Sequence, residues 1–127
     1  MDKDVIRTEE APAPFQGAPY NQAIRIGDLV FVAGQLGLQP GDTVIEGDIS
    51  QQTEQVMRNL AAILAAAGSS LDRLVKTTVF LDDLGDFQAM NAVYAEHVGD
   101  RPPARSTVEV AALPSGALVE IEAVAHV

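Results

Sequence analysis

Apolar residues recur along the chain in short runs that are typical of β-strands. Gly27 and Asp28 separate two of these runs, and such a pair suits the two-residue turn of a β-hairpin. A weaker apolar stretch at 43–45 lies in a glycine-rich segment, where we expect a short additional strand. The main strands are predicted at 23–26, 29–33, 74–81, 104–111 and 118–125.

Helical spacing of apolar residues marks two further segments. Residues 49–67 form the first, with Asp48 placed as the N-cap, Gln51 at the capping-box position and Gly68 at the end. A second helix is expected after Asp83, and it ends before the glycine at position 99. The order of strands and helices predicts a single α+β domain, with a mostly antiparallel or mixed sheet and two helices packed on one face.

The first part of the chain has a different character. Residues 1–16 mix charges with prolines and show neither helical nor strand periodicity. We therefore expect an N-terminal arm that is partly flexible, followed by the domain at 17–127. The length of 127 residues, of which 47% are apolar, suits one domain with one core. Aromatic residues make up only 5%, and such a small-residue core often gains stability from burial in an oligomer.

Charge and cysteine content narrow the possible functions. The chain has 18 acidic and 8 basic side chains and a net charge of −10, which disfavours nucleic acid and anionic membranes as partners. It has no cysteine, which excludes disulfides, thiolate nucleophiles and cysteine-ligated metals. No apolar run long enough for a signal peptide or a membrane span is present, so we expect a soluble cytoplasmic protein.

The last two strands carry the candidate chemistry. If their apolar sides face the helices, alternation places Arg105, Glu120 and Glu122 together on the open face of the sheet. Taken alone, this pattern favours an ordinary solvated face with weak ion pairs. The histidines at 97 and 126 are far apart in the sequence and are expected to be structural or exposed, so no metal site is predicted.

A string of motifs resembles the RidA-type reactive intermediate deaminases, also called YjgF-type proteins. Each motif is weak alone, but seven in this order and spacing are specific. The motifs are PYNQA at 19–23, AGQLG at 33–37, the helix end at 59–68, VKTTVFL at 75–81, the segment 86–94, PARSTVEV at 103–110 and LP with VEIEA at 113–123.

The resemblance implies a chorismate-mutase-like chain fold and a barrel-like homotrimer with clefts between subunits. It implies hydrolysis of enamines and imines, such as 2-aminoacrylate, 2-iminopropanoate and 2-iminobutanoate, to 2-keto acids and ammonia, without a cofactor. By the same resemblance, Arg105 holds the substrate carboxylate and Glu120 positions a water molecule. Tyr20, Asn91 and Thr107 are expected to line the same cleft.

The residues agree with this chemistry, because a guanidinium holds a carboxylate by two parallel hydrogen bonds and an imine is already electrophilic. Two alternatives stay open. The cleft could bind a small carboxylate such as a 2-keto acid for sensing or regulation, without turnover. An endoribonuclease activity, ascribed to some relatives, is disfavoured by the net charge of −10.

Overall fold

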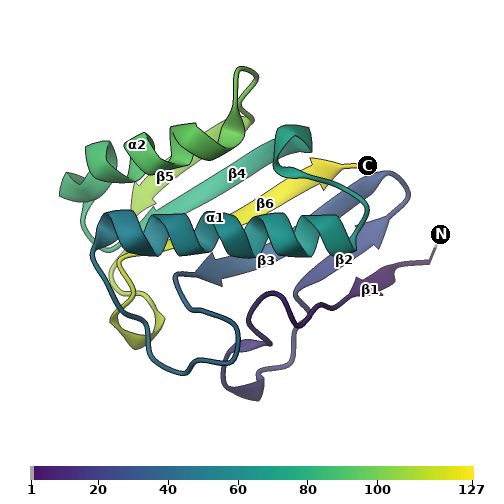
Figure 1. The fold of residues 1–127 in the computed structure, drawn as a ribbon, viewed down its shortest axis with the longest axis horizontal. Coiled ribbons are helices and arrows are strands. Elements are labelled where there is room, and N and C mark those ends of the chain that lie inside the picture. The colour runs from purple at the N-terminus through teal and green to yellow at the C-terminus, as the bar shows by residue number, and fades with distance from the viewer. Residues whose placement is uncertain (1) are drawn as a thin grey trace.

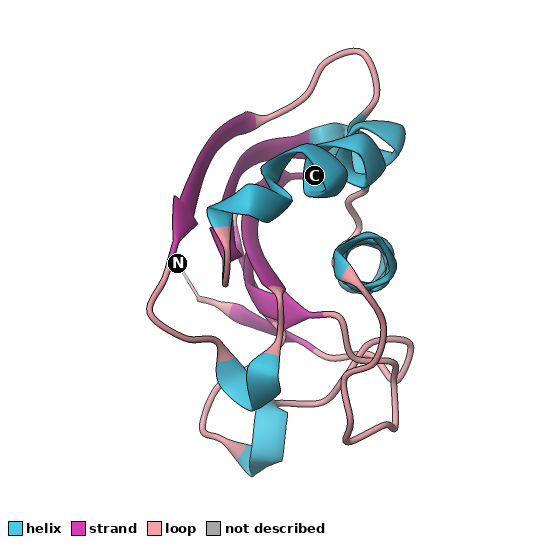
Figure 2. Cartoon of the chain, turned by 90° about the vertical axis from the view of Figure 1, so that its left-hand side faces the viewer, coloured by secondary structure: helices cyan, strands magenta, loops and turns pink. Residues whose placement is uncertain are grey.

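The fold is built on one mixed sheet, seen in a computed structural model that describes residues 2–127. The strand order is β1-β2-β3-β6-β4-β5, and all neighbours are antiparallel except the parallel pair β4 and β5. Both helices cover the same face of the sheet, which Figure 2 shows from the side. The elements in Figure 1 are β1 (Asp4–Ile6), β2 (Ala23–Ile26), β3 (Leu29–Leu36), α1 (Ile49–Ala66), β4 (Leu74–Leu81), α2 (Phe87–Val98), β5 (Ala104–Glu109) and β6 (Val119–His126).

The predicted α+β class, with one domain and two helices on one face, is confirmed. The hairpin of β2 and β3 turns at Gly27, whose φ of 58° favours glycine. Helix α1 begins with the expected capping box. The Gln51 N–H donates to the Asp48 carboxylate at 2.9 Å, and the Asp48 N–H donates to the Gln51 side-chain oxygen at 2.9 Å.

Two local predictions were wrong, and one element was not predicted. No strand forms at 43–45, where the chain runs as a loop. Asp83 does not cap α2, because its carboxylate accepts from the Gly85 N–H in a separate 3₁₀ turn and α2 begins at Phe87. The arm contributes an edge strand, β1, that pairs with β2, although three residues are too few for an alternation pattern to reveal.

The hydrophobic core lies between the sheet and α1. Val56, Met57, Leu60, Ile63 and Leu64 of the helix are fully buried against the sheet. Their spacing of three and four residues places them on one stripe of the helix, as the sequence pattern predicted. From the sheet, the core takes alternate residues, including Val30 of β3, Val79 of β4 and Ile121 of β6.

The face of the sheet opposite the helices is also apolar. Four of its side chains are between 41% and 45% exposed, and strand register places them all on this face. They are Val5, Leu29, Phe31 and Val108. We call this surface the open face. Exposed apolar side chains spread over one sheet face are typical of a surface that another protein chain covers.

Candidate functional site

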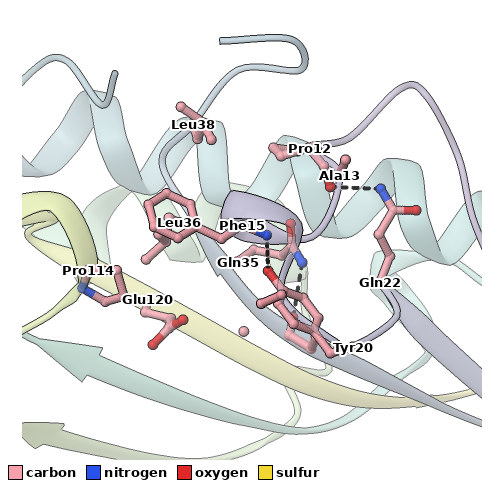
Figure 3. Close-up of a pocket in the computed structure, with 13 residues that line it drawn as sticks. Pro12, Ala13, Phe15, Tyr20, Gln22, Gln35, Leu36, Leu38, Pro114 and Glu120 are labelled. Atoms are coloured by element: carbon pink, nitrogen blue, oxygen red, sulfur yellow. Dashed lines mark hydrogen bonds between the residues drawn. The ribbon is translucent and has the colours of Figure 1, made fainter. Parts of the chain in front are cut away.

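Glu120 lies near the start of β6 and points from the open face into a cavity of about 340 Å³. Figure 3 shows its carboxylate among the lining residues, which come mainly from the arm and from β3. Burial raises the pKa of the Glu120 carboxyl above its ordinary value, and the charge of Glu122 raises it further. A carboxylate in this setting is a stronger base than one in open water, which suits proton transfer near neutral pH.

Gly34 makes room for that carboxylate. A Cβ atom at position 34 would lie 2.7 Å from the Glu120 Oε2 atom, well inside van der Waals contact. The β3–β6 register also shifts between Val32 and Gln35, so the strand bulges at this point. A glycine within a strand often marks a close approach of this kind, and that signal could have identified Gly34 from the sequence.

Tyr20 lies in the same cavity as Glu120, and both residues belong to one chain. Its hydroxyl oxygen accepts a hydrogen bond of 2.6 Å from the Phe15 N–H in the arm. The Tyr20 side chain is 40% exposed and therefore reaches the solvent-open side of the cavity. We call Tyr20, Gly34 and Glu120 the Glu120 group.

Arg105 lies elsewhere, on the face of the sheet that the helices cover. Its guanidinium carbon is 4.9 Å from the centre of the Tyr94 ring and 5.5 Å from that of Phe87, both on α2. The Tyr94 hydroxyl is 2.6 Å from the Thr77 hydroxyl, which fixes the ring beneath the guanidinium. Burial raises the pKa of Tyr94, while the Thr77 hydrogen bond and the Arg105 charge oppose that rise.

Asn91 and Thr107 accompany Arg105. Asn91 lies between Phe87 and Tyr94 on α2, at spacings of four and three residues, and therefore on the same helix face. Its side-chain oxygen is buried and has no hydrogen-bond partner among residues 2–127. Thr107 pairs with the buried Val79 in register, which places it on the same sheet face as Arg105. We call Arg105, Asn91 and Thr107 the Arg105 group.

The expectation that Arg105 and Glu120 share the open face was wrong. Strand β4 lies between β5 and β6, and register places Thr77 beside Arg105 but Phe80 beside Glu120. Because side chains alternate, the two residues project from opposite faces. The prediction failed because it assumed that the apolar side of β5 faces the helices, whereas Val108 on that side is 43% exposed on the open face.

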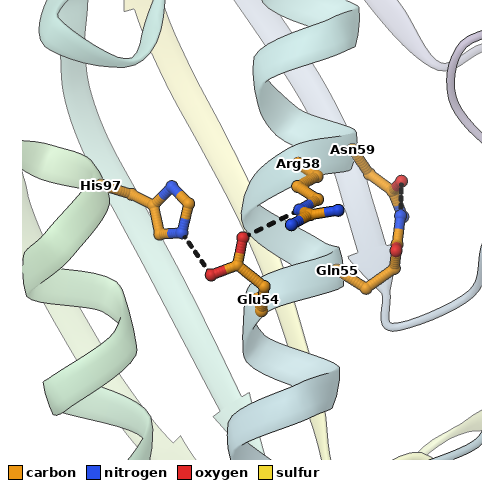
Figure 4. Close-up of polar contacts among 5 residues, drawn as sticks. All are labelled: Glu54, Gln55, Arg58, Asn59 and His97. Atoms are coloured by element: carbon orange, nitrogen blue, oxygen red, sulfur yellow. Dashed lines mark hydrogen bonds and ion pairs between the residues drawn. The ribbon is translucent and has the colours of Figure 1, made fainter.

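Two polar clusters stabilise α1 (Figure 4). The Glu54 carboxylate lies 2.9 Å from Nε2 of His97 on α2 and 2.9 Å from Nε of Arg58. These contacts lower the pKa of Glu54. One turn on, the fully buried Asn59 donates to the carbonyls of Leu36 and Leu38 at 3.1 and 2.9 Å. Asn59 thereby fixes the end of β3 that lines the cavity, and no sequence pattern indicated this role.

Comparison with known proteins identifies the family. Residues 8–127 match the family described as endoribonuclease L-PSP. A RutC family protein of Pyrococcus abyssi is 50% identical over 127 residues, covering 99% of this chain and 98% of that protein. Reactive Intermediate Deaminase A of Arabidopsis thaliana is 48% identical over 127 residues, covering 98% of this chain and 66% of the plant protein. The chain belongs to the RidA (YjgF) family.

Solved RidA-family structures share the fold. The crystal structure of Escherichia coli TdcF with bound serine superposes with a TM-score of 0.90 at 38% identity, covering 98% of each chain. The serine is a property of that crystal structure. Within residues 2–127 of the present RidA-family chain, no group of three or more histidines and carboxylates could hold a metal ion. Neither α1 nor α2 is long and apolar enough to cross a membrane.

Proposed function

We propose that this RidA-family protein hydrolyses reactive enamines and imines of small amino acids to 2-keto acids and ammonia. The expected substrates are 2-aminoacrylate, 2-iminopropanoate and 2-iminobutanoate. The observation that carries the proposal is the half-buried Glu120 carboxylate, whose raised pKa suits a base, in a cavity shared with Tyr20. The name of the plant relative, a reactive intermediate deaminase, supports the same activity.

The reaction needs little beyond orientation and a proton relay. Glu120 accepts a proton from water as the water oxygen bonds to the imine carbon, and the C=N electrons move to nitrogen. The proton then passes to the nitrogen and gives a neutral carbinolamine. Glu120 next transfers the hydroxyl proton to the same nitrogen as the C–N bond breaks, so that the keto group forms and ammonia leaves. This sequence consumes one water and uses no cofactor.

Arg105 is the proposed carboxylate anchor. Stacking on Tyr94 and Phe87 holds the guanidinium plane, and neither of the two ion pairs found among residues 2–127 involves it. A planar guanidinium binds a carboxylate through two parallel hydrogen bonds. Asn91 and Thr107 would contribute further polar contacts beside it, including the unpartnered Asn91 oxygen.

We place the complete site between protomers of a homotrimer. The Arg105 group and the Glu120 group lie on opposite faces of one chain, so a single protomer does not hold both beside one small substrate. The apolar open face supplies surface that association would bury. Light scattering should give a trimer at micromolar concentration, and a stable monomer would contradict this arrangement.

A second candidate is a small-carboxylate binding protein without useful turnover, and the bound serine in the TdcF structure favours it. The endoribonuclease description of the family is disfavoured for this chain by its net charge of −10, so we propose that it binds neither nucleic acid nor anionic membranes. We also propose that the protein acts in the cytoplasm.

The deciding experiment follows keto-acid and ammonia release from freshly generated 2-aminoacrylate. We expect the protein to accelerate release well above the spontaneous rate. Calorimetry with pyruvate, run alongside, separates the two candidates. Pyruvate binding without acceleration would establish the binding protein and contradict the deaminase.

A further inference from the structure

Gln22 fastens the N-terminal arm to the domain. Gln22 directly precedes β2 and is only 4% exposed. The amide nitrogen lies 2.8 Å from the Pro12 carbonyl, 3.0 Å from that of Thr8 and 3.2 Å from that of Ala11. The amide oxygen accepts from the Thr8 N–H at 2.7 Å. One buried side chain therefore satisfies four backbone groups of a segment that has little secondary structure of its own.

The fastened arm forms one wall of the cavity that contains Glu120. Pro12, Ala13 and Phe15 line it from the arm, and Leu36 at the end of β3 and Leu38 just beyond it line the other side (Figure 3). The hydrogen bond from the Phe15 N–H to Tyr20 ties this wall to the Glu120 group. The position of the wall thus depends on Gln22 at one end and on Tyr20 at the other.

The chemistry of the lining restricts what can enter. Glu120 is the one charged side chain among the residues that line this cavity, and no lysine or arginine lines it. The other lining side chains are mostly aliphatic, together with the aromatic rings of Phe15 and Tyr20 and the amides of Gln22 and Gln35. A substrate with a charged side chain would lose the hydration of that charge here without gaining a partner. A substrate with an apolar side chain would bury carbon surface. A methyl group would leave much of the 340 Å³ unfilled.

We propose that the arm, positioned by Gln22, forms an apolar side-chain subsite, so that imines of larger apolar amino acids are preferred over 2-iminopropanoate. This inference rests on the proposed function, because it assigns part of that site. Gln22 acts as a positioning residue, and Phe15 contacts the substrate side chain. The imine of leucine should react with a kcat/KM about tenfold or more above that of 2-iminopropanoate.

The test compares two imines and two non-reacting keto acids. An amino-acid oxidase generates the imines of leucine and alanine in the assay, and calorimetry measures binding of 4-methyl-2-oxopentanoate and pyruvate. Gln22→Met keeps the side-chain length but removes all four hydrogen bonds. Gln39→Met is the matched control, because Gln39 is exposed and lies outside this cavity.

We expect wild type and Gln39→Met to prefer the larger imine and the larger keto acid. Gln22→Met should reduce both preferences about fivefold, mainly through KM, and should speed hydrogen exchange at the Thr8 amide. Equal kcat/KM for the two imines, with equal affinity for the two keto acids, would overturn the subsite. Unchanged preferences in Gln22→Met, despite faster exchange at Thr8, would overturn the positioning role.

The keto-acid binding measurements distinguish this inference from the proposed function. If neither imine is hydrolysed but the larger keto acid binds more tightly, the deaminase fails and the subsite stands. If both imines are hydrolysed at the same rate, the deaminase stands and the subsite fails. If neither imine reacts and neither keto acid binds, both proposals are wrong. Phe15→Ala, which removes the aromatic wall without touching Gln22, should lose the preference even if Gln22→Met does not fold.

Discussion

Arg105 and Glu120 project from opposite faces of the sheet, with strand β4 between the strands that carry them. Arg105 stacks on α2, and Glu120 lies in the cavity beneath the N-terminal arm. The Arg105 group has a guanidinium held against two aromatic rings, which suits carboxylate binding. The Glu120 group has a carboxyl group of raised pKa, which suits proton transfer. An activity that needs both residues at one substrate therefore needs two protomers.

Substitution of Arg105 should weaken substrate binding in a graded way. Arg105→Lys keeps the charge but loses the two-point contact, and Arg105→Ala loses both, so activity should fall in that order. Loss of the contact should lower kcat/KM by a factor of about 30 to 1,000. Arg101→Ala is the control, since Arg101 is exposed and outside the group. A folded, trimeric Arg105→Ala that hydrolyses 2-iminopropanoate near the wild-type rate would exclude the anchor.

The pH profile should report the ionisation of Glu120. Because the carboxylate is the active form and its pKa is raised, kcat/KM should fall with decreasing pH at a point above the usual glutamate range. Glu122→Gln removes the neighbouring negative charge, lowers the pKa of Glu120 and should move this acid limb to lower pH. Glu120→Gln should lower kcat more than it weakens pyruvate binding. An acid limb that persists unchanged in Glu120→Gln would assign it to another group.

Gly34→Ala should displace the Glu120 carboxylate, because the new Cβ would lie 2.7 Å from Oε2. A shift of about 1 Å at a catalytic group can cost up to about 100-fold, so we expect kcat to fall about tenfold or more. Gly85→Ala introduces a similar contact, 3.0 Å from the Asp83 carboxylate, but far from the cavity, and should leave kcat unchanged. Equal kinetics in the two variants would show that Gly34 does not position Glu120.

Glu54→Gln should lower the free energy of unfolding near neutral pH by about 0.2–1 kcal/mol, the range of solvent-exposed ion pairs. Contacts with His97 and Arg58 lower the pKa of Glu54 in the folded state. The stabilisation from these contacts is therefore present above the ordinary glutamate pKa of 4.5 and is lost as the pH falls through the lower pKa of the folded state. Urea titrations should show that the difference in unfolding free energy between wild type and Glu54→Gln disappears at acid pH. Glu96→Gln, an exposed control, should not differ from wild type. A difference in unfolding free energy that grows at acid pH would contradict this prediction.

Local patterns predicted the elements well where one rule dominates. Asp48 and Gln51 mark the start of α1, and the apolar stripe ending at Leu64 gives its buried face. Alternation is misleading in β5, because the apolar side of this strand, which carries Val108, faces away from the helices. That rule fails on a sheet whose second face is also apolar.

The candidate site was only partly predictable for a related reason. The motifs identified Tyr20 and Glu120, and the structure places them in one cavity. The separation of Arg105 from Glu120 depends on the strand order, in which β4 lies between β5 and β6. No local sequence pattern encodes this long-range pairing. Gln22 was missed as well, because nothing in the sequence shows that a polar residue will be buried against a folded arm.

Complementation between two inactive variants tests the shared site most directly. Arg105→Ala and Glu120→Gln chains should each show little deaminase activity as separate trimers. After unfolding and joint refolding at equal ratio, about one interface in four should combine an intact Arg105 with an intact Glu120 from the neighbouring protomer. We therefore predict recovery of about a quarter of the wild-type activity with 2-iminopropanoate. A co-assembled mixture no more active than the separate variants would contradict a site built from two protomers.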